Sequence, residues 1–311
     1  MKKNGAVNYP KVKLRDGSVE ATVFSPDASS GYYRGARFDW SGVIEELCWN
    51  KHVFFADWKT PHDPCDPEAS RSTAEEFRVH LCFKTSLGFN EAGAADPFIK
   101  IGVGLLEKDK EKDYRFWQSY RIAVPGKWTV DSGRNQVTFI QTLSFGGHAY
   151  VYHKQVILRN SPPGFDIVHQ LKNTGEKPVE NIHYCHNFFI IDRQPIGPGY
   201  SLELPFAPEL KRNLSGSAVF NGKILEFKRE LAPGEMLFSE LGNFTAGSSN
   251  SAIIRNIKTG AGVKITGDLP VKEYNLFFTL TAMCPEPIVE IRVMPGEEKF
   301  WVNKYDLFSG G

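Results

Sequence analysis

Alternating apolar and polar residues recur along much of the chain, and this pattern constrains the fold more than any other feature. In residues 76–84, EFRVHLCFK, every second side chain is apolar, which is the period of a half-buried β-strand. Residues 148–159 are rich in β-branched and aromatic side chains, and residues 165–172 alternate again. The 23 Phe, 11 Tyr and 6 Trp also favour strands over helices. The sequence therefore predicts an all-β protein.

Turn residues punctuate these predicted strands at regular intervals, at residues 173–178, 231–235, 258–262 and 294–297. Residues 41–47 are the segment in which we expect one or two helical turns. Residues 57–76 are rich in Asp, Pro and Ser and predict a long surface loop, a common place for ligands to bind. Since no low-complexity linker or repeat divides the chain, we expect a single domain of packed antiparallel sheets over residues 1–311.

Charge and cysteine content exclude several classes of protein. The 37 Lys and Arg residues nearly balance the 36 Asp and Glu residues, which argues against a nucleic-acid partner. The sequence contains no run of 18 apolar residues, so we expect no membrane-spanning helix. The five cysteines include no C-x-x-C pair, which predicts free thiols. Because the first residues also lack an apolar leader, we expect a cytoplasmic location. No glycine-rich nucleotide motif and no G-x-S-x-G pattern occurs, so nucleotide binding and serine-hydrolase chemistry have no support in the sequence. We expect no cofactor.

His183 and His186 are the first candidates for chemistry, because histidine transfers protons near neutral pH. On a helix their spacing would place both on one face and suggest a metal pair. The flanking residues are typical of a strand, however, where residues three apart point to opposite faces. We therefore expect no metal site here. His186, in Cys-His-Asn-Phe-Phe, is either a structural histidine or a proton donor.

Two further motifs carry charged side chains. In Cys284-Pro-Glu-Pro287 a carboxylate lies between two prolines, after a predicted core strand at residues 274–283. Glu286 is then a fixed general base at a strand end, or a surface charge in a turn. Residues 32–40 place Arg34, Arg37 and Asp39 among aromatic rings, a combination that suits sugar binding or an arginine-rich strand edge.

The order of these segments resembles the galactose mutarotase-like superfamily of aldose 1-epimerases, most of all an uncharacterised bacterial branch. The similarity extends over roughly residues 30–305, nearly the whole chain. It is carried by an early arginine motif, a middle block, a turn and a histidine-containing strand, at residues 33–42, 98–106, 171–178 and 186–189.

This resemblance implies a β-supersandwich with a sugar cleft across one sheet. It also implies an isomerase that interconverts the anomers of a small sugar. We expect this protein to be a monomer or homodimer and to use no metal. The family's acid, which protonates the ring oxygen, matches His186, and its base matches Glu286, with Glu290 as second choice. The sugar-binding positions that we assign with it are Arg34, Arg37, Asp39, Asn187 and His148.

The chain departs from the family pattern in ways that leave alternatives open. The family's second histidine has only His80 and His148 as candidates, and Asn187 follows His186 instead of preceding it. A modified or phosphorylated sugar would need cations such as Lys100, Arg115 or Arg121. A carbohydrate-binding protein without turnover is the main alternative. A polysaccharide lyase or hydrolase is less expected, because the chain has no helical domain.

Overall fold

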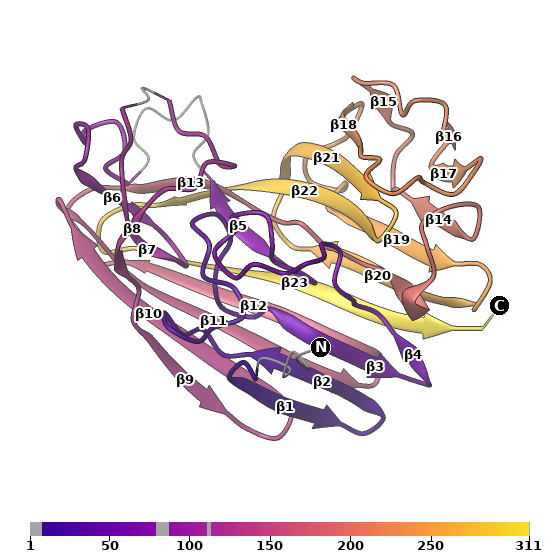
Figure 1. Cartoon of the computed structure of the whole chain (residues 1–311), viewed down its shortest axis with the longest axis horizontal. Coiled ribbons are helices and arrows are strands. Elements are labelled where there is room, and N and C mark those ends of the chain that lie inside the picture. The colour runs from indigo at the N-terminus through magenta and orange to yellow at the C-terminus, as the bar shows by residue number, and fades with distance from the viewer. Residues whose placement is uncertain (1–7, 79–86, 111–112, 311) are drawn as a thin grey trace, which may run out of the picture.

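The computed structural model describes residues 8–78, 87–110 and 113–310, and almost every regular element in these ranges is a β-strand (Figure 1). The helical segment among them is η1 (Ile191–Arg193), a 3-10 turn of three residues. No helix in the described ranges is therefore long and apolar enough to cross a membrane. The all-β prediction is confirmed.

The largest element is a ten-stranded antiparallel sheet that forms one wall of the core. Its long strands contain the predicted segments 148–159 and 165–172, which confirms both as strands. In spatial order the strands are β16 (Ala218–Asn221), β17 (Ile224–Phe227), β14 (Tyr200–Glu203), β19 (Ser251–Asn256), β20 (Ala261–Gly267), β23 (Glu298–Ser309), β12 (Pro163–Asn173), β11 (His148–Asn160), β10 (Gln136–Phe145) and β9 (Trp128–Ser132).

A six-stranded antiparallel sheet packs against this wall. Phe77 and Ile291 of the six-stranded sheet share a buried cluster with Tyr152 and Trp301 of the ten-stranded sheet. Each such side chain stabilises the fold by about 1.5–3 kcal/mol through burial. In spatial order the strands are β15 (Glu209–Leu210), β18 (Leu237–Gly242), β21 (Val271–Thr279), β22 (Ala282–Val293), β13 (Val179–Cys185) and β5 (Glu75–Arg78).

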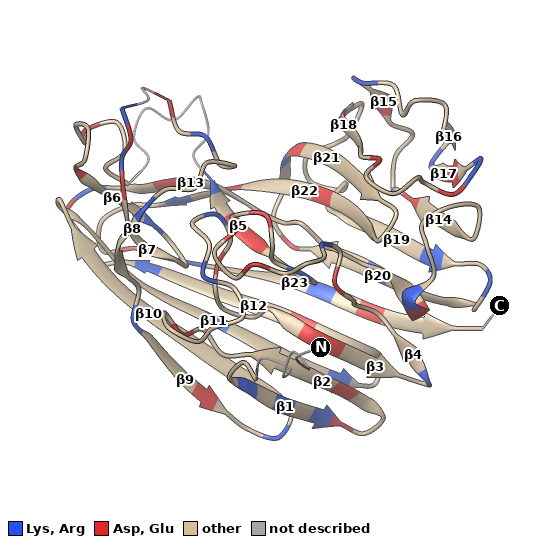
Figure 2. Cartoon of the chain, viewed as in Figure 1, with Lys and Arg blue, Asp and Glu red and all other residues tan. Residues whose placement is uncertain are grey.

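Two small sheets complete the structure. One lies at the lower front in Figure 1 and contains β1 (Lys11–Asp16), β2 (Val19–Phe24), β3 (Ile44–Trp49) and β4 (His52–Val53). The other contains β6 (Pro97–Lys100), β7 (Gly104–Glu107) and β8 (Ile122–Pro125). Lys/Arg and Asp/Glu residues are intermixed over all four sheets (Figure 2), as the balanced composition suggests.

Two predicted segments differ from the structure, and a third is described only in part. The helical turns expected at residues 41–47 are wrong, because Ile44 and Leu47 are buried in strand β3 and pairing with β2 decides the local conformation. The core strand predicted at residues 274–283 is divided by a turn between β21 and β22. The strand predicted at residues 76–84 begins as β5, and its residues from 79 on, with His80, lie outside the described ranges.

Candidate active site

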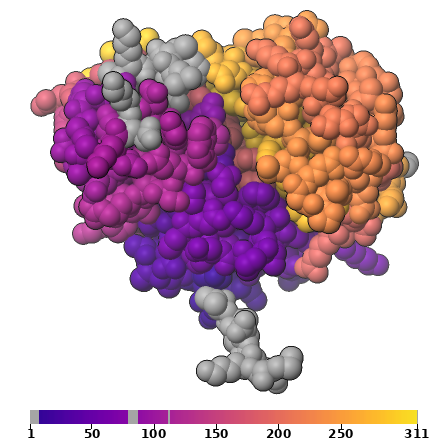
Figure 3. Space-filling view, turned by 45° about the horizontal axis from the view of Figure 1, so that its top comes forward, coloured from indigo at the N-terminus to yellow at the C-terminus, as the bar shows by residue number. Residues whose placement is uncertain are grey.

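A cleft of about 600 Å³ lies over one face of the six-stranded sheet. Figure 3 shows a hollow on this side of the molecule, between an indigo-to-magenta lobe and an orange lobe. Side chains from strands β18, β21, β22, β13 and β5 and from neighbouring loops line the cleft. They are Arg37, Glu68, Arg78, Phe116, Trp117, Tyr184, His186, Arg212, Met236, Phe238, Glu240, Glu273, Asn275, Phe277 and Glu286.

The register of the sheet places polar side chains in a row across the cleft floor. Glu240 pairs with Asn275, and Asn275 pairs with Glu286. Directly paired residues in a sheet point to the same face. His186 follows the last residue of β13, the strand beside β22, and extends the row. The pairing of strands distant in sequence therefore brings His186 and Glu286 together.

The two side chains are in direct contact. Nδ1 of His186 lies 2.8 Å from Oε1 of Glu286. Both residues are about 5% exposed, with His186 at 5% and Glu286 at 4%. Phe188 stacks on the imidazole with 4.1 Å between ring centroids, which fixes the ring plane. Nδ1 and Oε1 are both buried without a hydrogen-bond partner among residues 8–78, 87–110 and 113–310, so their contact is a close ion-pair contact and not a hydrogen bond. Nε2 of His186 and Oε2 of Glu286 have no ion-pair partner in those ranges, and both residues line the cleft, so these two atoms are the ones that a ligand can reach.

Glu286 lies inside strand β22 and not at a strand end, which corrects the prediction from the sequence. Proline is unusual in a central strand because it lacks an N–H group. Here the ladder between β22 and β13 ends at the Val289–His183 pair, before Pro287 and Pro285. Beyond that point the Asn187 side chain donates to the Pro285 carbonyl at 2.9 Å. Strand β22 is therefore not paired with β13 at Pro285 and Pro287, the residues that lack an N–H donor.

Asn187 does not line the cleft but supports it from behind. Its amide nitrogen donates to the Pro285 carbonyl, and its amide oxygen accepts from the Tyr305 hydroxyl at 3.0 Å. The residue is 1% exposed and has a φ of 51°, a region that asparagine tolerates better than most residues. The sequence predicted Asn187 as a sugar ligand, whereas the structure places its side chain between β22 and β23.

Arg37 is at the cleft wall as predicted, but its guanidinium is used by protein groups. It donates to Glu76 at 3.0 Å, to Glu68 at 2.6 Å and to the Tyr184 hydroxyl at 2.9 Å. Burial raises the pKa of Glu76, but the charges of Lys100 and Arg37 outweigh burial and lower that pKa to about 2. Arg37 therefore orders the cleft wall, and Tyr184 in particular.

The other predicted sugar ligands lie away from the cleft. Arg34 donates to the backbone carbonyl of Ser29. His148 is buried at the start of β11, where burial and then the Lys177 charge lower its pKa. None of Lys100, Arg115 and Arg121 lines the cleft, and Lys100 forms a buried ion pair with Glu76 at 2.9 Å.

Asp39 belongs to a buried polar cluster beneath the cleft. Its carboxylate accepts from the Lys154 ammonium at 3.2 Å and from the Tyr152 hydroxyl at 3.1 Å, both on β11. Gly102, from the middle block of the family resemblance, lies directly against it, since a Cβ there would be 2.7 Å from Cγ of Asp39. The arginine motif at residues 33–42 and the middle block at residues 98–106 are therefore adjacent in space, and both contribute to the buried support beneath the cleft.

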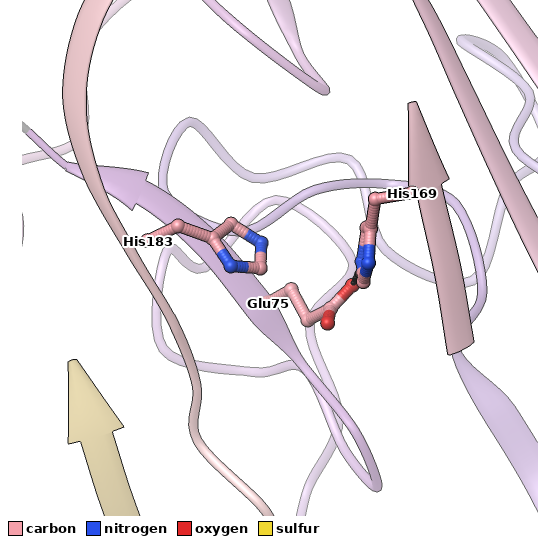
Figure 4. Close-up of side chains that lie close together, drawn as sticks. All are labelled: Glu75, His169 and His183. Atoms are coloured by element: carbon pink, nitrogen blue, oxygen red, sulfur yellow. Dashed lines mark hydrogen bonds and ion pairs between the residues drawn. The ribbon is translucent and has the colours of Figure 1, made fainter. Parts of the chain in front are cut away.

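The same cluster contains Glu75, His169 and His183, whose ligand atoms all lie within 4.8 Å of one another (Figure 4). Such a set could hold a metal ion on spacing alone. However, the Lys154 ammonium lies 2.7 Å from the Glu75 carboxylate, and His169 Nε2 lies 2.9 Å from it. A cation already neutralises that carboxylate, so the residues fit a buried ion-pair network better than a metal site.

His183 and His186 do face opposite sides of the sheet, as the strand periodicity predicted. His183 packs in the core against Phe77 and Trp301, and His186 lines the cleft. Burial lowers the pKa of His183 to about 3, so it is a neutral core histidine.

Sequence reasoning missed several cleft residues, chiefly Asn275, Trp117 and Arg78. Asn275 is a polar residue in an otherwise apolar strand, and that contrast is the one signal that could have identified it. Trp117 lies in an irregular segment with no recognisable motif. Arg78 is one of the polar residues in the alternating pattern of β5, but only the pairing with β13 shows that its side of the sheet is the cleft side.

No known family model and no curated protein sequence matches the chain. Solved structures do. The Slr1438 protein of Synechocystis sp. PCC 6803 matches with a TM-score of 0.60 at 11% identity, over 100% of both chains. A galactose mutarotase-like protein from Clostridium acetobutylicum matches with 0.58 at 12% identity, over 96% of this chain and 95% of that one. The GalM/aldose epimerase homologue from C. elegans matches with 0.53 at 11% identity, over 98% and 100%.

Proposed function

We propose, from the galactose mutarotase-like fold of this chain, that it is an aldose 1-epimerase with His186 and Glu286 as its acid and base. The observation that carries the proposal is the 2.8 Å contact between these two side chains at the floor of a cleft. A histidine and a carboxylate held together, each with one polar atom left for a ligand, are suited to moving two protons on one sugar.

The reaction follows from the two available atoms. Oε2 of Glu286 accepts the proton of the anomeric hydroxyl, while Nε2 of His186 donates a proton to the ring oxygen. The bond between C1 and the ring oxygen breaks and an aldehyde forms. Rotation about the C1–C2 bond presents the other face of the aldehyde, and both protons return as the ring closes. Each acid or base group of this kind contributes roughly 10²–10⁴ to a rate.

The cleft provides groups that suit a neutral sugar. Asn275 is adjacent to Glu286 in the sheet register and presents an amide, which can both donate to and accept from hydroxyl groups. Phe277 contributes an apolar ring beside it, 5.0 Å from the His186 ring. The lining carries both Arg and Glu side chains, so no large charge of one sign favours an ionic ligand.

Anomer exchange tests the proposal directly. Saturation-transfer NMR or polarimetry over a panel of aldoses should show exchange faster than in buffer for at least one sugar. If no sugar exchanges faster than in buffer, the proposal fails. Sugars that raise the melting temperature without exchanging would identify the alternative, a carbohydrate-binding protein that uses the same cleft.

A further inference from the structure

The cleft is longer than one sugar ring. It crosses five neighbouring strands, from β18 to β5, which makes four inter-strand spacings. At about 4.8 Å each, the floor is about 19 Å long. A single sugar ring at His186 and Glu286 therefore spans only part of this length, and the cleft has room for a second ring.

Trp117 stands at the β5 end of this cleft. It is 56% exposed, whereas Trp40 and Trp301 are buried and the other three tryptophans are half-buried. Phe116 packs edge-on against it, with 4.8 Å between centroids. An exposed tryptophan that lines a cleft is a typical ligand platform, because its rigid ring offers a large apolar face at low entropic cost.

Two arginines lie against Phe116, the ring that packs on Trp117. The Arg37 guanidinium lies 4.5 Å from the centre of the Phe116 ring, and the Arg78 guanidinium lies 5.4 Å from it. Arg78 approaches Glu273 at 3.8 Å, which is longer than a hydrogen bond, so its donors can also reach ligand hydroxyls. An aromatic face and a guanidinium fork together match the C–H face and the hydroxyl edge of a sugar ring.

The opposite end of the cleft is less suited to a sugar. Arg212 and Glu240 satisfy each other there with two hydrogen bonds of 2.9 Å. The exposed apolar side chain at that end is Met236, which is flexible and 67% exposed. The second ring is therefore better accommodated at the β5 end.

We propose that the substrate is a reducing disaccharide or longer oligosaccharide, with its reducing ring at His186 and Glu286 and the next ring on Trp117. This inference rests on the proposed function for the place of the reducing ring. It names the substrate class of that site and makes Trp117 a specificity-determining residue.

Isothermal titration of the whole chain with maltose, cellobiose and lactose, and with glucose and galactose, tests this inference. At least one disaccharide should bind about tenfold more tightly than its constituent monosaccharide, as expected for one added aromatic contact. Trp117→Ala should abolish this preference and Trp117→Phe should retain part of it. Phe300→Ala is the matched control, since Phe300 is 55% exposed and does not line the cleft.

Equal binding of disaccharides and monosaccharides would overturn the inference, as would a Trp117→Ala variant that weakens both equally. Binding is measured here without turnover, so the result is separate from the proposed function. A Trp117-dependent preference without anomer exchange would support this inference and refute the epimerase. Monosaccharide exchange without any preference would refute this inference alone.

Discussion

Glu75 and Glu76 are neighbours in strand β5, and their carboxylates serve opposite faces of the six-stranded sheet. Glu75 points into the core and contacts the Lys154 ammonium at 2.7 Å, on the ten-stranded sheet. Glu76 points toward the cleft and accepts from Arg37 and from the Tyr184 hydroxyl. One short strand therefore links the buried ion-pair network to the cleft wall, through the alternation of a β-strand.

Replacing Lys154 tests the importance of the buried network. Lys154→Met removes the cation between the Asp39 and Glu75 carboxylates, which are all 0–1% exposed. Breaking a buried ion pair on one side leaves unpaired charge in the core, so we expect a loss of about 3–5 kcal/mol in the free energy of unfolding. Urea denaturation measures this loss.

The matched control for Lys154→Met is Arg15→Ala, at the exposed ion pair between Arg15 and Glu20. An exposed pair contributes under about 1 kcal/mol, so the control should be close to wild type. Similar losses in both variants would show that the buried network has no special role in stability.

The free energy of unfolding should decrease as the pH is lowered through a window set by His183. Burial lowers the pKa of this residue from 6.5 to about 3. Between these pH values the unfolded chain binds a proton at His183 and the folded chain does not, so stability decreases as the pH falls from 6.5 to 3. One such group contributes a slope of up to about 1.4 kcal/mol per pH unit.

His183→Gln removes this titrating group. The free energy of unfolding, measured by urea denaturation at several pH values, should then depend less steeply on pH than in wild type over the same window. The readout is the slope and not the absolute stability, which the substitution also changes. Identical slopes would mean that His183 does not stay neutral in the folded protein.

Asn187 should affect both stability and catalysis, although it does not line the cleft. Asn187→Ala removes the bonds to the Pro285 carbonyl and the Tyr305 hydroxyl, and the lost buried hydrogen bonds should cost about 2 kcal/mol or more in unfolding free energy. Because Pro285 precedes Glu286, anomer exchange by the folded variant should also slow. Exchange at the wild-type rate would show that this support does not position Glu286.

The strands and the pair His186–Glu286 could be anticipated from the sequence for different reasons. The long strands β11 and β12 follow from local alternation and β-branched content, which are properties of consecutive residues. His186 and Glu286 were identified by a resemblance and not by spacing, since they are 100 positions apart in the printed sequence. The structure brings them into contact, and their catalytic roles remain a prediction.

The rest of the site depended on pairings that a sequence does not display. Arg37 and Asp39 are two residues apart in an irregular segment, yet one faces the cleft and the other faces Lys154 in the core. Asn275 joined the cleft because β21 pairs with β22 in one particular register. A shift by one residue would have turned that side chain into the core.

The exchange rate of the Glu286→Gln variant, measured by saturation-transfer NMR on the sugar that wild type exchanges fastest, tests the central claim most directly. Glutamine keeps the shape of the side chain but cannot accept the anomeric proton, so the rate should fall roughly 10²–10⁴-fold. Glu240→Gln, in the same cleft but not in contact with His186, is the control and should retain most of the rate. A Glu286→Gln protein that exchanges anomers as fast as wild type would contradict the account.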